Sequence, residues 1–198
     1  MELLSALEAS GFSMWVKESS TAYVAILAFH TIGLVFLVGI SGITALRIIG
    51  IFPSLPLRPM QGFFPLMWVG LGINAVTGLL LICLYPTNYF VDPSFYIKLA
   101  CVATAVVIIV KLIPQVFAEG LDSETVAKSE SVRRSAKILL FVWLVATVTG
   151  RVIAYSIDTK VQTGIAVAIV LVLALIVGRL IGPNLGLLEW PKDRTENS

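Results

Sequence analysis

Charged residues are scarce in this sequence. They make up 13% of its 198 residues, whereas hydrophobic residues make up 58% and the mean hydropathy is +0.95. A soluble domain carries about 25% charged residues, so this chain lacks the polar surface that a water-soluble fold requires. The net charge of +2 is also too small to indicate a nucleic-acid partner. The composition therefore excludes a soluble globular protein and indicates one solvated mainly by lipid.

Motifs for metal binding and catalysis are absent as well. The chain has one histidine, His30, and two cysteines, Cys83 and Cys101, with no CxxC or Cys/His cluster, so no structural zinc site is expected. No GxSxG, HExxH, P-loop or GxGxxG pattern occurs in a suitable context. We therefore expect no enzymatic activity. Each cysteine is interpreted as a small hydrophobic residue, although a disulfide between neighbouring spans is geometrically conceivable.

Long apolar runs supply the positive signal. A helix needs about 20 mainly apolar residues to cross a bilayer, and several runs in the chain reach this length. We predict an all-α integral membrane helical bundle, with a membrane domain over residues 21–182 and a cytoplasmic tail over 183–198. Its five transmembrane helices are expected at about 22–49, 63–85, 94–116, 136–157 and 162–181.

Residues 1–20 alternate charged and apolar side chains before the first span. Leu3, Leu7 and Trp15 fall near helical spacing, which predicts an amphipathic helix lying in the membrane interface. A disordered tail is the alternative. The segment does not have the basic start, apolar run and small-residue cleavage site of a signal peptide.

Basic residues are distributed unevenly between the two sides of the predicted membrane domain. By the positive-inside rule, we expect the N-terminus outside and the C-terminus in the cytoplasm. A re-entrant pair of the last two spans would instead place the tail outside. Four lysines and arginines fall on the outer side, namely Lys17, Lys98, Arg151 and Lys160. Ten fall on the inner side, namely Arg47, Arg58, Lys111, Lys128, Arg133, Arg134, Lys137, Arg179, Lys192 and Arg194.

Polar side chains fall in the outer half of four of the expected spans. Counting along the helices at about 1.5 Å per residue places His30 roughly 12 Å and Arg151 roughly 9 Å below the outer surface. Lys98 lies one turn into its span, Asn74 lies somewhat deeper, and Tyr155 accompanies Arg151. These five residues predict an outward-facing polar pocket that binds a ligand.

The two ionisable residues of this predicted pocket have alternative interpretations. Arg151 has no acidic residue within a span to offset its charge, so it either binds an anion, such as a carboxylate, phosphate or haem propionate, or extends to the lipid headgroups. His30 is either a structural residue bonded to Asn74 or a backbone carbonyl, a haem ligand, or a proton or quinone contact. Ligation by two histidines is excluded, which leaves a haem held by His30 alone or by His30 with a methionine such as Met67. We expect no cofactor, with haem b and quinone as the alternatives, and no metal unless His30 holds haem.

Several stretches resemble a known family. They are His30–Gly33, Ala45–Gly50, Trp68–Leu80, Pro93–Leu99 and Gly150–Tyr155. In these stretches the chain is similar to an uncharacterised family of small bacterial multi-span membrane proteins, a domain of unknown function (DUF6644-like). The resemblance implies the bundle fold and the bacterial inner (cytoplasmic) membrane, and it implies no activity. A fainter similarity to cytochrome-b-like and copper-resistance membrane bundles depends on the lone histidine of the first span.

The chain departs from this family at two positions. The family usually has an aspartate where this chain has Ala45, which would leave Arg47 without its partner. Relatives often carry a histidine near the inner end of the third span, where this chain has VKLIP.

Three functions are compatible with the sequence. The main hypothesis is a non-enzymatic accessory or structural subunit of a larger membrane complex. Its glycine-rich faces, with Gly33 in the first span and Gly70 in the second, would pack against other helices, other membrane subunits or a second copy of the chain within the lipid bilayer. The alternative is a redox protein that binds haem or quinone through His30 and Arg151. A small transporter is the third, although there is no internal repeat and no acidic residue within the membrane.

Overall fold

The computed structural model describes residues 2–120, 122–153 and 155–183, which form helices and no strand. The helices that are long and apolar enough to cross a membrane are α3 (Ser20–Ile48), α4 (Phe64–Leu84), α6 (Pro93–Phe117), α8 (Glu130–Val152) and α9 (Ile157–Ile181). The shorter helices are α1 (Glu2–Glu8), α2 (Gly11–Glu18), η1 (Arg58–Phe63), α5 (Pro86–Val91) and α7 (Ser123–Ala127). The predicted all-α membrane bundle is confirmed. The predicted tail over 183–198 lies, except for residue 183, outside the described residues.

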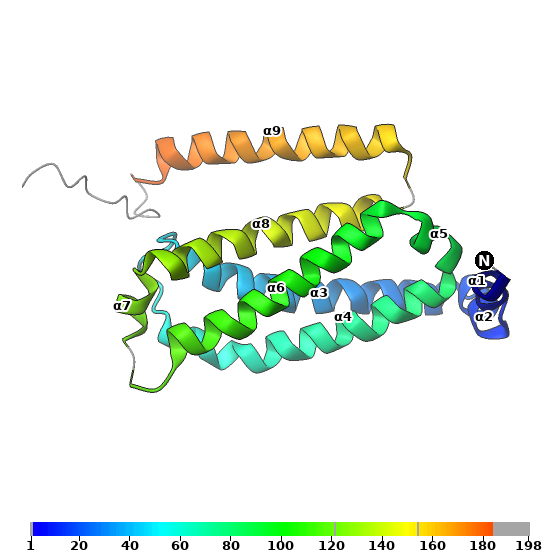
Figure 1. Ribbon diagram of the computed structural model, residues 1–198, viewed down its shortest axis with the longest axis horizontal. Helices are drawn as coiled ribbons and strands as arrows, with labels where there is room; N and C mark the ends of the chain where they lie inside the picture. The colour runs from blue at the N-terminus through cyan, green and yellow to red at the C-terminus, as the bar shows by residue number, and fades with distance from the viewer. Residues whose placement is uncertain (1, 121, 154, 184–198) are drawn as a thin grey trace, which may run out of the picture.

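Four long helices form the bundle. α3 packs along α4, α6 packs along α8, and contacts between α3 and α8 join the two pairs. α4 and α6 meet where α4 begins and α6 ends, because the rings of Phe64 and Phe117 lie perpendicular with centroids 5.0 Å apart. From there the two helices diverge toward α5 (Figure 1). The two helices are therefore farther apart at the end that holds α5.

The hydrophobic core follows this arrangement. Its main cluster includes Leu37, Met67, Ile109 and Trp143, which are contributed by the four bundle helices. The Trp143 indole N–H donates to the Ser41 hydroxyl at 2.9 Å, so this buried polar pair joins α8 to α3. A second, smaller cluster closes the α5 end and contains Val16, Leu81 and Leu84.

α3 and α4 approach each other closely at two glycines. A methyl group on Gly33 would lie 2.8 Å from the carbonyl oxygen of Gly70 and 2.9 Å from the backbone nitrogen of Asn74. A methyl group on Gly70 would lie 2.7 Å from the β-carbon of Phe36. Small residues permit such contact between membrane helices. Gly39, in contrast, has open space around its α-carbon.

The start of α9 differs from the sequence expectation. The predicted fourth span ended at residue 157 and the fifth began at 162, but α8 ends at Val152 and α9 begins at Ile157. The reason is local: the Ser156 side chain caps α9 by accepting a hydrogen bond from the Thr159 backbone N–H, and Asp158 lies in the first turn, where a negative charge is favourable. The helix therefore starts before the segment that was expected to be a loop.

α9 lies beside the bundle along α8 (Figure 1), and none of its residues is buried. The Lys160 ammonium lies 2.7 Å from Asp92, the residue that caps the start of α6, and this ion pair ties α9 to the bundle. α9 is 25 residues long and runs antiparallel to α8 along the length of the bundle (Figure 1). The N-terminus and the end of α9 consequently lie at opposite ends of the molecule (Figure 1).

The N-terminal segment forms two short helices where one was predicted, because Ser10 caps a new helix at Gly11. The hydroxyl of the buried Ser13 lies 3.0 Å from the carbonyl oxygen of Cys83, which fastens α2 to the end of α4. The Thr87 hydroxyl donates to the Glu8 carboxylate and thereby holds the pKa of that carboxyl below its usual value. The segment is therefore attached to the α4–α5 end of the bundle.

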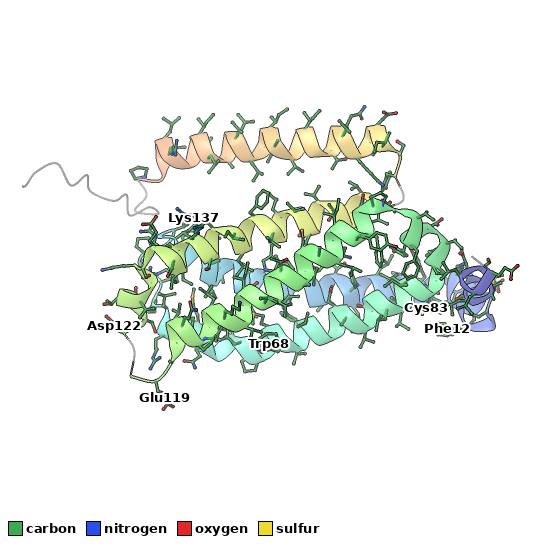
Figure 2. The ribbon with its side chains drawn as sticks, in the orientation of Figure 1. Phe12, Trp68, Cys83, Glu119, Asp122 and Lys137 are labelled. Atoms are coloured by element: carbon green, nitrogen blue, oxygen red, sulfur yellow. The ribbon has the colours of Figure 1, made fainter. Side chains whose placement is uncertain are left out.

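The opposite end of the bundle is joined by charged side chains. The Arg47 guanidinium donates to Glu124 at 2.7 Å, and the other carboxylate oxygen of Glu124 accepts from the Leu57 backbone N–H at 3.2 Å. Arg47 therefore has a partner despite the alanine at position 45, which corrects the expectation from the family pattern. Figure 2 shows Glu119, Asp122 and Lys137 near this same end, whereas Phe12 and Cys83 lie near the other. Cys83 and Cys101 are both free thiols.

Candidate functional site

A cavity of about 320 Å³ lies between α4 and α6 at the α5 end of the bundle, where these helices diverge. We call it the His30 pocket. Most of its lining is aliphatic or aromatic, and the polar side chains among its lining residues are His30, Asn74, Tyr89 and Lys98. The lining comprises His30, Leu71, Asn74, Ala75, Gly78, Leu79, Leu81, Ile82, Tyr89, Phe95, Lys98, Leu99, Val102 and Ile153.

His30 is held in place by Thr77 on the facing helix. Its Nδ1 lies 2.9 Å from the Thr77 hydroxyl oxygen. That hydroxyl donates its only hydrogen to the Ile73 carbonyl at 2.6 Å, so its oxygen is free to accept from His30. We therefore assign the proton of the neutral ring to Nδ1, which leaves Nε2 as an acceptor. Gly78 provides the space beside the ring, since a methyl group there would already touch Cε1 at 3.5 Å.

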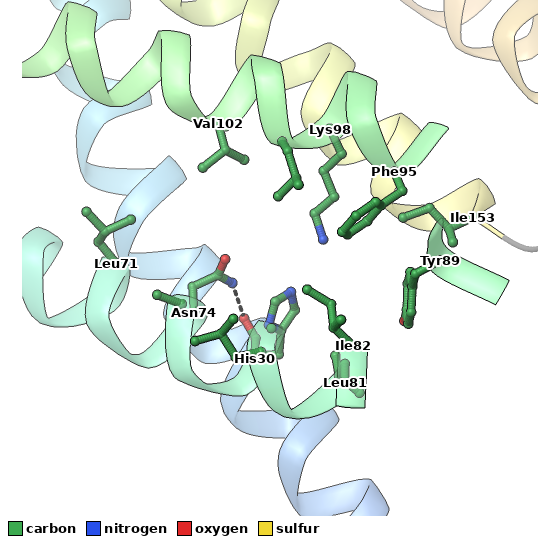
Figure 3. Close-up of a pocket in the computed structure, with 14 residues that line it drawn as sticks. His30, Leu71, Asn74, Leu81, Ile82, Tyr89, Phe95, Lys98, Val102 and Ile153 are labelled. Carbon is green, nitrogen blue, oxygen red and sulfur yellow. Dashed lines mark hydrogen bonds between the residues drawn. The ribbon is translucent and has the colours of Figure 1, made fainter. Parts of the chain in front are cut away.

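Asn74 joins the same site from α4. Its side-chain N–H donates to the backbone carbonyl of His30 at 3.0 Å (Figure 3). This bond fixes the amide and directs its oxygen away from α3, toward the cavity (Figure 3). The backbone nitrogen of Asn74 also lies against Gly33, where α3 and α4 cross. The position of the site therefore depends on the close approach of these two helices.

Lys98 enters the His30 pocket from α6. Figure 3 shows its amine pointing toward His30 and Asn74. Its alkyl chain lies on Gly150 of α8, where a methyl group would stand only 3.1 Å from Cδ and 3.2 Å from Cε. Within residues 2–120, 122–153 and 155–183, no carboxylate forms an ion pair with this amine. The pocket therefore presents a cation in an apolar surrounding.

Arg151 and Tyr155 do not line this pocket. Arg151 lies in the last turn of α8 and is exposed, because the helix ends at Val152 and not at residue 157. Tyr155 is also exposed and lines a different, shallow pocket with Asp92 and Lys160. The depth predicted for Arg151 assumed a helix that continues to residue 157, whereas α8 ends at Val152. Of the five predicted residues, the structure brings together only His30, Asn74 and Lys98.

The structure does not bring His30 and Met67 together as a pair of haem ligands. Met67, the candidate partner of His30, is fully buried in the main core beside Ser41 and Leu112 and does not line the His30 pocket. The described part of the chain also contains no group of three His, Cys, Asp or Glu side chains that could hold a metal ion.

Three contributions to the site were missed from the sequence. Tyr89 was assigned to a loop, but it lies on the short helix α5 and lines the pocket with Phe95. Gly150, which supports Lys98, belongs to the GRVIAY stretch that resembles the family, and this was the one available signal for it. The pairing of Thr77 with His30 depends on how α3 and α4 face each other, which no local pattern reveals.

A second cavity lies against α3 near the other end of the bundle. This apolar groove of about 550 Å³ is lined by residues of α3, of the following loop and η1, and of the start of α4, among them Phe36, Ile43, Pro59 and Phe63. The hydroxyl of Thr44, its one polar side chain, already donates to the Ile40 carbonyl at 2.8 Å. The groove therefore offers a ligand one hydroxyl oxygen as an acceptor and no side-chain donor, whereas several polar side chains converge on the His30 pocket.

Comparisons with known proteins add no assignment: no family model, no curated protein and no solved structure matches the chain. The function must therefore be argued from the pocket itself. The pocket combines an apolar wall with a few converging polar groups, which is the composition typical of small-molecule sites.

Proposed function

We propose that this is a non-enzymatic integral membrane protein that binds a lipid-soluble molecule with a polar head in the His30 pocket. The observation that carries the proposal is the convergence of His30, Asn74 and Lys98 on one mainly apolar cavity between two membrane helices. A volume of about 320 Å³ lies within the usual range of small-molecule sites. No nucleophile paired with a base accompanies these groups among the lining residues, which favours binding over catalysis.

The mouth of the pocket favours a ligand that arrives through the bilayer. Leu79 of α4 and Leu99 of α6 both line the cavity, yet they are 64% and 46% exposed. Exposed leucines on helices of this kind contact lipid. The opening between them therefore faces the membrane interior, so that a lipid-soluble molecule can reach the polar groups without leaving the bilayer.

The setting we propose is the bacterial inner membrane, with the N-terminus outside and the end of α9 in the cytoplasm. The support is the excess of Lys and Arg at the end that holds Arg47, Arg58 and Arg133. The resemblance to the DUF6644-like family supports the same membrane. The His30 pocket would then lie in the outer half, and the protein would act as an accessory subunit that holds its ligand for a larger complex.

Filling the pocket tests the binding function. We expect Ala75→Trp to reduce the amount of a co-purifying small molecule at least tenfold, because Ala75 lines the cavity and is itself exposed, so an indole can enter the cavity without displacing buried side chains. The measurement is mass spectrometry of organic extracts from the gently solubilised full chain. Val76→Trp is the matched control, since Val76 is the next residue of α4, is 60% exposed and does not line the cavity.

The result would count against binding if wild-type and Ala75→Trp extracts were alike. A redox form of the same site is the second candidate, because the Nε2 of His30 is left as an acceptor or ligand by the bond to Thr77. A quinone in the wild-type extract, absent from Ala75→Trp, would identify that form. A Soret band in the visible spectrum of the purified protein would identify haem.

A further inference from the structure

The charge inside the His30 pocket is one-sided. Lys98 enters a cavity whose lining contains no aspartate or glutamate. The ion pairs of Asp92 with Lys160 and of Glu8 with Lys17 belong to the ends of the helices and not to the pocket. A cation within a membrane helix is costly unless it is partnered or reaches water. Here the side chain is directed toward His30 (Figure 3), and no carboxylate of residues 2–120, 122–153 and 155–183 forms an ion pair with it.

The fold holds this lysine in place. The absence of a side chain at Gly150 leaves the groove in which the Lys98 alkyl chain lies, with Cδ, Cε and Nζ at 3.1, 3.2 and 3.4 Å from the position a methyl group would take. The Lys98 side chain therefore extends from α6 across the surface of α8 before its amine reaches the cavity. A lysine that extended outward to the lipid headgroups would not need to pass over Gly150 of α8.

Resting on the binding function proposed above, we infer that the ligand is a long-chain amphiphile with a singly charged carboxylate head, and that Lys98 binds the carboxylate. One ammonium balances one negative charge, which favours a carboxylate over a phosphate dianion. The ammonium donates to carboxylate oxygens, and Tyr89 bears the one hydroxyl among the lining residues.

The size and the mouth of the cavity specify the rest of the molecule. A volume of about 320 Å³ holds a head and the first part of a chain. The remaining methylenes would leave between Leu79 and Leu99, whose exposed side chains face lipid. A small carboxylate such as acetate has no alkyl chain to make this apolar contact. The shape of the cavity therefore favours an amphiphile that enters from the membrane.

Photolabelling with matched probes tests the inference. The full chain in lipid nanodiscs is labelled with a diazirine-bearing C18 acid or with the C18 alcohol of the same chain. We expect half-maximal labelling by the acid at a concentration at least tenfold lower, because hydrogen bonds to charged groups are worth about this factor or more. Acetate added at the acid's half-maximal concentration should not compete.

Substitutions of Lys98, Lys111 and Gly150 test whether the Lys98 ammonium is the group that binds the carboxylate. Lys98→Met should remove the difference between acid and alcohol by raising the half-maximal concentration of the acid, and circular dichroism of the solubilised variant checks that it folds. Lys111→Met is the matched control: Lys111 is on the same helix, exposed and distant from the pocket, and its loss should preserve the tenfold difference. Gly150→Ala, which displaces the lysine chain, should weaken the acid and not the alcohol.

Each contrary outcome has its own meaning. Equal half-maximal concentrations for acid and alcohol in the wild type, or an unchanged difference in Lys98→Met, would overturn the carboxylate inference and leave the binding function intact. Competition by acetate as strong as by the acid would overturn the amphiphile. Absence of saturable labelling by either probe would overturn the binding function itself.

Discussion

Replacing Gly33 by alanine is expected to destabilise the protein by about 3 kcal/mol, the upper end of the range for overpacking a tight contact. The added methyl would stand 2.8 Å from the Gly70 carbonyl and 2.9 Å from the Asn74 nitrogen. Both are backbone atoms, so relief requires α3 and α4 to separate. For a chain of this size the unfolding temperature should fall by about 6–12 °C, measured by circular dichroism of the solubilised protein.

The control for this substitution is on the same helix. Gly39→Ala adds the same methyl group in open space, and it should leave the unfolding temperature unchanged or slightly raised, because alanine favours the helix over glycine. Gly33→Ala should also weaken ligand binding, since His30 and Asn74 face each other across this crossing. Equal unfolding temperatures for the two variants would contradict the close approach of α3 and α4.

Removing the carboxylate of Glu124 is expected to cost about 2 kcal/mol of stability. The Arg47 side chain is only 11% exposed, so it would keep a largely buried charge without its partner. Loss of one member of a buried pair costs about 3–5 kcal/mol. We expect less because the Glu124 side chain is 45% exposed and solvent screens the pair. Thermal unfolding of Glu124→Ala measures this loss.

A double-mutant cycle separates the pair from other effects. Arg47→Met combined with Glu124→Ala should cost at least about 1 kcal/mol less than the sum of the two single substitutions, since residues in contact couple at this level. Glu119→Ala is the control, because Glu119 is exposed on the same connection and forms no ion pair within the part of the chain that the structure describes. Strict additivity of the two single variants would show that the pair contributes nothing.

The helices were predictable where their signals are local. Asp92 and Pro93 indicated the start of α6, and Asp92 indeed caps it by accepting from the Ser94 N–H at 2.9 Å. The start of α9 was missed because hydropathy favoured the aliphatic run after residue 161, while the cap at Ser156 depends on a single side chain. Single capping side chains thus decide where the helices end, and an average of hydropathy over many residues does not detect them.

For the site, the sequence predicted only how far along its helix each polar residue lies. Distance along each helix placed His30, Asn74 and Lys98 at similar levels, and the structure does bring them together. The direction in which each side chain points depends on helix rotation and on contacts such as Gly33 with Gly70. Arg151 was misplaced for a different reason, since its predicted depth depended on the end of α8.

The most direct test of the account is to map where an uncharged, long-chain diazirine alcohol labels the full chain in nanodiscs. The account predicts that saturable label concentrates on peptides from 71–82 and 89–102, which line the His30 pocket, and falls in Ala75→Trp. The account would be contradicted if the label concentrated on peptides from 35–44 and 55–66, which line the apolar groove. In that case the peptides of the His30 pocket would be labelled no more than α9, whose residues are not buried.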